Sequence, residues 1–191
     1  MKKAIIFDFF GVISSEVAPF WFAERFEREE ALRLKEEYMG PSDRGEVSEE
    51  ETFKRLSLLS GESAEEIYAD FTKRAVIDVE TVALIERLKK TYKIVLLSNA
   101  MSSWLKNILD KNSLMRLFDF AVISADEKIA KPDRRIFELA LNRANITADE
   151  AIFIDDNKKN VDGAIRVGIE GIIFTDAQSL EAELIKHRVL V

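Results

Sequence analysis

Short apolar runs that end in acidic residues are the feature that most constrains the fold of this chain. Ile5–Phe7 leads into Asp8, and Ile152–Ile154 leads into the pair Asp155 and Asp156. Runs of this length without polar alternation are typical of strands that are buried on both faces of a parallel sheet. The acidic residues then fall where the strands end, at one edge of that sheet.

The same pattern recurs along the chain. Apolar residues at helical spacing fill the intervals after residue 79, for example in 79–88 and 136–141. Strands that alternate with helices predict an α/β fold with a doubly wound, Rossmann-like parallel sheet. We expect its strands at residues 3–8, 93–98, 120–124, 151–155 and 171–174.

Residues 16–78 interrupt this alternation, because they contain no convincing strand and look like several helices with a loop at 40–45. Ser48, followed by Glu51 three residues later, has the pattern of a capped helix start, and Ser63 repeats it. We therefore predict a core domain made of residues 1–15 and 79–191, with a small helical cap domain inserted at 16–78.

Composition removes several classes of function. The chain has 191 residues, no cysteine, one histidine and a formal net charge of -7. Thiol nucleophiles are excluded, and Ser-His-Asp hydrolysis and His-ligated zinc are disfavoured. The acidic balance argues against nucleic acid as a partner, and no apolar stretch is long enough for a signal peptide or a membrane span. We expect a cytoplasmic protein that does not bind the membrane; the sequence does not predict its oligomeric state.

Residues able to take part in phosphoryl chemistry gather at the expected strand ends. They are Asp8, Ser98 and Asn99, Lys128 and Lys131, and Asp155 and Asp156. Carboxylate oxygens are ligands that Mg²⁺ prefers, together with waters and a substrate phosphate. The glycine at position 11 would let the backbone after Asp8 approach a ligand closely.

Each of these residues has a role in a phosphoryl transfer. Asp8 could attack phosphorus as a carboxylate nucleophile and form an aspartyl-phosphate. The Ser98 hydroxyl and the Asn99 backbone N–H would bind the phosphoryl oxygens, and Lys131 would neutralise the charge of the transferring group. The sequence thus predicts a magnesium-dependent phosphatase that acts on a small phosphorylated molecule.

Four segments of the chain resemble the ordered motifs of the haloacid dehalogenase-like superfamily, namely residues 7–12, 97–99, 130–133 and 153–160. The helical insertion lies where that superfamily has its small cap. The resemblance implies that Asp8 is the nucleophile and a magnesium ligand, together with the Phe10 carbonyl and Asp156. It makes Asp155 an additional or water-mediated ligand. Residues 44–50 are similar to the caps of sugar-phosphate phosphatases and of the phosphatase domain of epoxide hydrolases.

Phe10 departs from the superfamily pattern, in which most phosphatases carry Asp at this position. That Asp protonates the leaving group and later activates water, and such general acid–base help is worth about 10²–10⁴-fold in rate. Its absence favours substrates with good leaving groups. A cap carboxylate could take its place; Glu16, Asp43 and Glu46 are candidates, and the sequence does not choose among them.

The aromatic Phe10 also resembles the 2-haloacid dehalogenases, which displace halide from carbon without a metal. Asp155 and Asp156 argue against this alternative, because adjacent carboxylates beside Asp8 raise each other's pKa unless a cation neutralises them. A protein that binds a phosphate ligand or a partner with little turnover is the other alternative. A mutase is disfavoured, since both of its half-reactions need the proton transfer that Phe10 cannot supply.

Some residues keep two interpretations at this stage. Asn160 either orients a site carboxylate or faces solvent, and the aromatic residues of 20–26 either fill the cap core or line a substrate pocket. We expect Lys128 to be solvated and His187 to lie on a surface tail.

Overall fold

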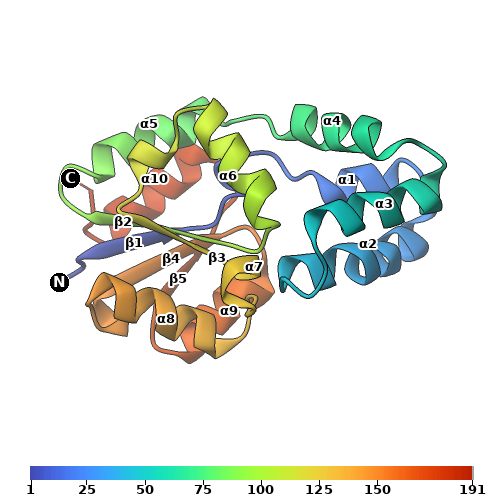
Figure 1. Cartoon of the computed structure of the whole chain (residues 1–191). Coiled ribbons are helices and arrows are strands. Elements are labelled where there is room, and N and C mark those ends of the chain that lie inside the picture. The colour runs from blue at the N-terminus through green and yellow to red at the C-terminus, as the bar shows by residue number, and fades with distance from the viewer. Residues whose placement is uncertain (191) are drawn as a thin grey trace.

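A five-stranded parallel sheet forms the centre of the molecule (Figure 1). The structure is a computed structural model and describes residues 1–190. The strands lie in the order β3-β2-β1-β4-β5. The expected α/β fold with a doubly wound parallel sheet is confirmed. The bounds of the strands are β1 Ala4–Phe7, β2 Lys93–Ser98, β3 Phe120–Ile123, β4 Ala151–Asp155 and β5 Glu170–Ile173.

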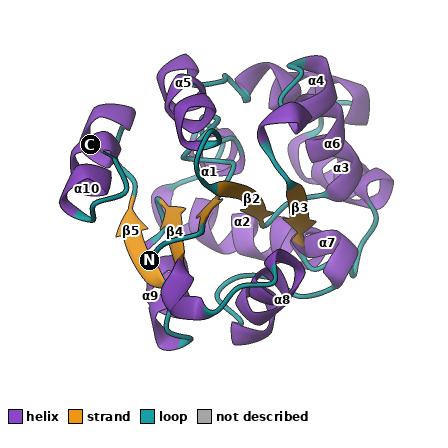
Figure 2. Ribbon diagram, turned by 90° about the vertical axis from the view of Figure 1, so that its left-hand side faces the viewer, coloured by secondary structure: helices purple, strands orange, loops and turns teal. Residues whose placement is uncertain are grey.

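Helices cover both faces of the sheet, as Figure 2 shows end-on. Their bounds are α1 Ala18–Ala23, α2 Arg28–Asp43, α3 Glu49–Ser60, α4 Ala64–Arg74, α5 Val79–Leu88, α6 Ser102–Lys111, α7 Ser124–Glu127, α8 Arg134–Ala144, α9 Lys158–Arg166 and α10 Ala177–Lys186, with 3-10 turns at Met115–Leu117 and Ala148–Glu150. In Figure 1, α5, α6 and α10 lie on one side of the strands, and α8 and α9 lie on the other.

Alternate residues of β1 to β4 enter two separate apolar cores. Ile5 and Phe7 of β1 belong to the larger core, which includes side chains of α5, α6 and α10. Ile6 of β1 belongs to the smaller core, with side chains of α8 and α9. Because both faces are covered, the strands are continuous apolar runs, and the polar residues are left at their ends.

The four helices α1–α4, which we call the helical insertion, lie beyond one end of the sheet (Figure 1). Two chain segments join the insertion to the rest of the molecule. They run side by side, with hydrogen bonds from Ser15 N to Val76 O (2.9 Å) and from Asp78 N to Ile13 O (2.9 Å). The division into domains at residues 15/16 and 78/79 stays a prediction.

The expected loop at residues 40–45 is wrong, because α2 continues through Gly40 and Pro41 to Asp43. Burial of Gly40 and Ser42 stabilises this last stretch. The Ser42 hydroxyl also lies 2.6 Å from the hydroxyl of Thr52 in α3. Tertiary contacts here outweigh the helix-breaking tendency of Gly and Pro. The helix starts expected after Ser48 and Ser63 are present, and both serines accept a backbone N–H three residues on.

Candidate active site at the strand ends

The register of the central strands brings Asp8 next to Asp155. Phe7 of β1 pairs with Ile154 of β4, and Asp8 N donates to Ile154 O at 2.9 Å. Asp8 directly follows β1 and Asp155 is the last residue of β4, and both are buried, with 7% and 0% of their surface exposed. Two acidic groups in this position need a positive partner, because an unpaired buried charge is strongly destabilising.

Lys131 provides that partner. Its ammonium lies 2.8 Å from Asp8 Oδ2 and 2.7 Å from Asp155 Oδ2, and its side chain is fully buried. Asn99 holds the backbone of Lys131 on both sides. The Asn99 amide donates to Lys131 O at 2.9 Å, and Asn99 Oδ1 accepts from Lys131 N at 2.8 Å. The structure thus gives Asn99 a positioning role that the sequence did not indicate.

Asn160 and the start of α9 fix the orientation of Asp155. The Asn160 amide donates to both Asp155 oxygens, at 3.2 and 3.0 Å, and Asn157 N donates to Oδ1 at 2.8 Å. Asn160 is buried. Of its two interpretations, the structure supports the one in which it orients a site carboxylate.

Burial and the neighbouring charges together shift the pKa values of Asp8 and Lys131. The pKa of Asp8 is raised well above its ordinary value by burial, an effect that the Lys131 ammonium opposes and the charge of Asp155 reinforces. The pKa of Lys131 is raised because the two carboxylates favour its charged form more than burial disfavours it. The ammonium is therefore retained, and the carboxylates share it.

A third carboxylate completes an acidic group. Single oxygens of Asp8, Asp155 and Asp156 all lie within 4.8 Å of one another. Gly11, at φ +79°, leaves room for Asp156, because a Cβ there would lie 2.4 Å from Asp156 Oδ2. Among the described residues, no backbone hydrogen bond ends on the carbonyl oxygen of Phe10. Hard oxygen ligands of this kind suit Mg²⁺.

Ser98 is the remaining predicted site residue at a strand end. It closes β2, next to β1 in the sheet, and is completely buried. Its hydroxyl has no hydrogen-bond partner within residues 1–190. An unpartnered buried hydroxyl is uncommon in proteins and is expected where a ligand supplies the missing bond.

The Phe10 ring belongs to an aromatic column. It stacks on Trp104 of α6, with ring centroids 5.0 Å apart and planes inclined by 9°, and Phe9 meets it edge-on at 4.9 Å. Trp104 in turn contacts Phe71 of α4 and donates from Nε1 to Thr72 Oγ1 at 3.2 Å. Phe10 therefore joins the sheet to the helical insertion, and its side chain cannot exchange a proton.

The three candidate cap carboxylates differ in their surroundings. Glu46 is exposed and forms a paired contact with Arg44, at 2.8 and 3.1 Å. Glu16 is half-buried, and burial and then the charge of Asp156 raise its pKa. Burial raises the pKa of Asp43 to about 7, and the charge of Glu16 contributes. Glu16 and Asp43 thus belong to the electrostatic surroundings of the site, whereas Glu46 is bound to Arg44.

Other predictions fall outside this cluster. Lys128 is exposed, as expected. His187 is half-buried beside Glu170 and Glu183, so it is not on a free tail. Trp21 and Phe22 fill the core of the insertion, whereas Phe20 is 57% exposed.

Sequence reasoning missed Lys35 and Trp104. The positive charge of Lys35 acts on Glu16, Asp43 and Asp156, which belong to separate segments. Trp104 stacks on Phe10 from a helix far along the chain. No local pattern marks either residue, because their partners come together only in the folded chain.

Residues 2–168 match the family model described as "Hydrolase: haloacid dehalogenase-like hydrolase". One curated relative is the sesquiterpene phosphatase astK of Aspergillus oryzae, 27% identical over 146 residues, which are 74% of this chain and 74% of the relative. Another is the (S)-2-haloacid dehalogenase 4A of Burkholderia cepacia, 32% identical over 89 residues. That match spans 46% of this chain and 38% of the dehalogenase.

The fold is also found among solved structures. An enzyme of the same family from Bacteroides thetaiotaomicron, crystallised with magnesium and inorganic phosphate, superposes with a TM-score of 0.77. It is 22% identical, and the match covers 92% of this chain and 95% of that one. Within residues 1–190, we find no helix with the length and apolar character needed to cross a membrane.

Proposed function

We propose that this chain, which belongs to the haloacid dehalogenase-like hydrolases, is a magnesium-dependent phosphatase of small phosphorylated molecules. The observation that carries the proposal is the pairing of Asp8 with Lys131 inside a group of three carboxylates, beside the unpartnered Ser98 hydroxyl. The phosphatase among the relatives supports the same class of reaction. A cytoplasmic location stays a prediction from the sequence.

The net charge of the cluster supports a divalent cation. In their ionised forms, Asp8, Asp155 and Asp156 carry three negative charges against the one positive charge of Lys131, and a bound cation would offset this excess. The side chains of Asp8 and Asp156, with the Phe10 carbonyl, would hold Mg²⁺, and Asp155 would bind directly or through water. When bound, the ion supplies Lewis-acid polarisation of the phosphoryl oxygens and neutralises their charge.

Asp8 is positioned to act as the nucleophile. Its Oδ1 accepts a hydrogen bond from Phe9 N at 2.7 Å, and its Oδ2 contacts Lys131. As an Asp8 oxygen forms its bond to phosphorus, the bond between phosphorus and the leaving oxygen breaks. Water then attacks phosphorus, the bond to Asp8 breaks, and the carboxylate is restored with release of phosphate.

Neighbouring side chains support the transferring group. Lys131 is held by Asn99 and Asp155, so its ammonium stays fixed while charge moves onto the phosphoryl oxygens. Fixed charges of this kind need no reorganisation during the reaction. The Ser98 hydroxyl and the Asn99 backbone N–H are proposed to bind the phosphoryl oxygens.

Dehalogenation is the second candidate, because Phe10 is aromatic and one relative is a 2-haloacid dehalogenase. In that reaction Asp8 would attack carbon and release halide without a metal. The position of Asp156 beside Asp8 and Asp155 disfavours it, since three carboxylates exceed the charge of Lys131 and a bound cation would offset the third. Halide release from 2-haloacids therefore belongs in the same assay.

The experiment measures phosphate release from acyl, aryl, sugar and alkyl phosphates with Mg²⁺ and with excess chelator. We expect magnesium-dependent turnover that falls by about 10⁴-fold or more in Asp8→Asn, as expected for loss of a covalent nucleophile. Asp110→Asn, in an exposed position of α6, is the matched control and should keep full activity. Lack of release from every phosphate, or equal activity in the two variants, would contradict the proposal.

A further inference from the structure

The proposed reaction leaves one proton without a donor. An alkoxide or phenoxide that leaves phosphorus must be protonated, and the ring of Phe10 is held between Phe9 and Trp104. The core side of the site offers no substitute, because Asp8, Asp155 and Lys131 are occupied with one another. Further acidic residues near the site are Glu16, just before the helical insertion, and Asp43, within it.

We propose that Asp43, the last residue of α2, is the general acid that protonates the leaving group, and that it then acts as the base for the attacking water. This inference rests on the proposed phosphatase function and adds to it a catalytic residue outside the strand ends.

The fold places the end of α2 over the strand ends from two directions. On one side, Gly45 packs so closely on α7 that a Cβ there would lie 2.2 Å from Ala125 O, and α7 follows β3 directly. On the other side, the charge of Glu16 acts on Asp43. The charges of Asp155 and Asp156, at the end of β4, act in turn on Glu16. Between β3 and β4 lie β2, which ends at Ser98, and β1, which Asp8 follows.

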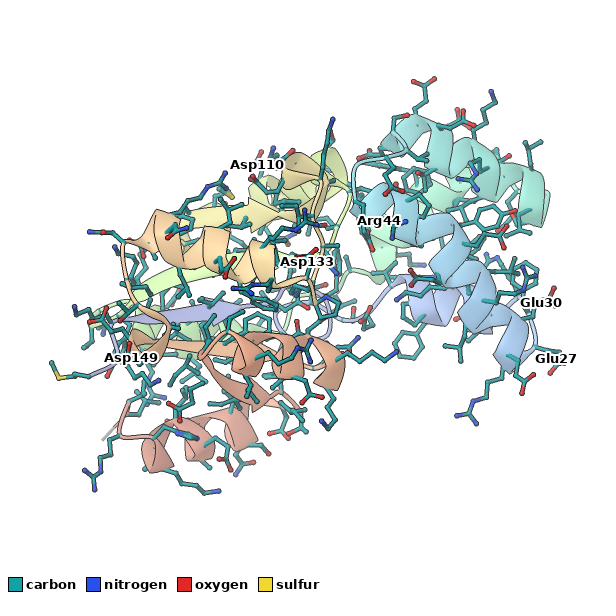
Figure 3. The ribbon with its side chains drawn as sticks, turned by 90° about the horizontal axis from the view of Figure 1, so that it is seen from below. Glu27, Glu30, Arg44, Asp110, Asp133 and Asp149 are labelled. Atoms are coloured by element: carbon teal, nitrogen blue, oxygen red, sulfur yellow. The ribbon has the colours of Figure 1, made fainter. Side chains whose placement is uncertain are left out.

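The end of α2 is also held firmly. Ser42 is buried and its hydroxyl lies 2.6 Å from Thr52 Oγ1, which donates to Ser48 O at 2.8 Å. Figure 3 shows Arg44, the next residue after Asp43, on the side of the insertion that faces the sheet. Asp43 is therefore on a rigid element, as a proton donor must be if it is to stay in reach of its acceptor.

The chemistry of Asp43 suits a proton donor at neutral pH. Among the described residues, no hydrogen bond is one of the main influences on its pKa. Burial raises its pKa to about 7, with Glu36 and Glu16 raising it further and Lys35 and Arg44 opposing them. A general acid works best when its pKa lies near the working pH.

The neighbouring acids are less suitable. Glu46 forms two hydrogen bonds to Arg44, which lowers its pKa and keeps it ionised. The charges of Asp156 and Asp155 raise the pKa of Glu16, so a cation bound by those two residues would favour the ionised form of Glu16. An ionised Glu16 helps to keep the proton on Asp43.

The protons that Asp43 gives up and takes up balance over one catalytic cycle. As the bond from phosphorus to the leaving oxygen breaks, that oxygen takes the proton of the Asp43 carboxyl, which becomes a carboxylate. When water attacks the aspartyl-phosphate, its proton passes to the Asp43 carboxylate and the oxygen forms the new bond to phosphorus. Asp43 and Asp8 then return to their starting states.

The test compares Asp43→Asn with the wild-type protein on phenyl phosphate and 4-nitrophenyl phosphate, with Mg²⁺. Phenolate needs the proton and 4-nitrophenolate does not. We expect kcat/KM for phenyl phosphate to fall by about 10²–10⁴-fold, and kcat/KM for 4-nitrophenyl phosphate to fall by less than about tenfold. The alkaline limb of the wild-type pH profile with phenyl phosphate should be missing in the variant.

Controls separate this role from a structural one. Glu46→Gln, three residues further on, should leave both rates unchanged. Asn resembles a protonated Asp in size and charge, so Asp43→Asn should fold and be no less stable than the wild type. Equal losses on both substrates, or no loss on phenyl phosphate, would overturn the role of Asp43. A wild-type protein that is inactive on both substrates would instead overturn the phosphatase function, and this inference with it.

Discussion

The acidic residues on the two sides of the site have different electrostatic surroundings. On the sheet side, Asp8 and Asp155 share the ammonium of Lys131, and Asp155 accepts further bonds from Asn160. On the insertion side, Asp43 has only burial and more distant charges to set its pKa. Under the proposed function, the fixed charges of the sheet side would hold the phosphoryl group, and the Asp43 carboxyl would exchange protons.

An aromatic column forms the border between these sides. Phe10, Trp104 and Phe71 connect β1, α6 and α4 without any charged group. The rings place apolar surface beside the sheet side, and electrostatic interactions are stronger where water is excluded. The chain therefore has a packing contact where most phosphatases of the superfamily have their acid.

The largest effect is expected from removal of the Lys131 ammonium on the sheet side. Lys131→Met leaves two buried carboxylates facing each other, so we expect the free energy of unfolding to fall by about 3–5 kcal/mol. Urea unfolding at pH 7 measures the change, and saturating Mg²⁺ should recover part of it. The exposed Lys128→Met is the control, within about 0.5 kcal/mol of the wild type. Equal effects of the two substitutions would contradict the account of the cluster.

Disrupting the border should have a smaller effect. Trp104→Phe shortens the stacked surface on Phe10 and removes the hydrogen bond to Thr72. We expect a loss of about 2 kcal/mol in the free energy of unfolding, from the aromatic contact and the bond together. Thr72→Val removes the bond alone and should lose about 1 kcal/mol. If Trp104→Phe lowered the free energy of unfolding no more than Thr72→Val does, the stacking of Trp104 on Phe10 would contribute nothing to stability.

The smallest expected effect is on the insertion side, where Asp43 should make the free energy of unfolding depend on pH. The pKa of Asp43 is raised to about 7 in the folded chain, so the folded state binds its proton more tightly than the unfolded state does. The free energy of unfolding should then fall as pH rises from about 4 to about 7, by on the order of 1 kcal/mol once solvent screening is included.

Asp43→Asn should remove that decline, as measured by urea unfolding at several pH values. Glu46→Gln is the matched control with the opposite sign. Its hydrogen bonds to Arg44 lower the pKa of Glu46, so its contribution is present above the unfolded pKa and is lost in acid. An Asp43→Asn variant whose stability has the wild-type pH dependence would contradict the raised pKa.

Much of the fold and of the sheet side was predictable from sequence, for a physical reason. Buried parallel strands are short apolar runs, and the residues after them meet at one edge, so Asp8, Ser98, Lys131 and Asp155 could be grouped before any coordinates were known. The insertion side was not predictable. The choice among Glu16, Asp43 and Glu46 depends on burial and on contacts between segments, and α2 extends through Gly40 and Pro41 because of tertiary packing.

A direct test of phosphoryl transfer to Asp8 is to quench the reaction with acid during turnover and to measure the masses of the protein's peptides by mass spectrometry. The account predicts that, with an aryl phosphate and Mg²⁺, the peptide containing Asp8 gains the mass of one phosphoryl group. This gain should disappear in Asp8→Asn and should accumulate in Asp43→Asn with 4-nitrophenyl phosphate, because that variant lacks the base for water. Turnover that proceeds with no phosphoryl group on this peptide, or with the group on another one, would contradict the account.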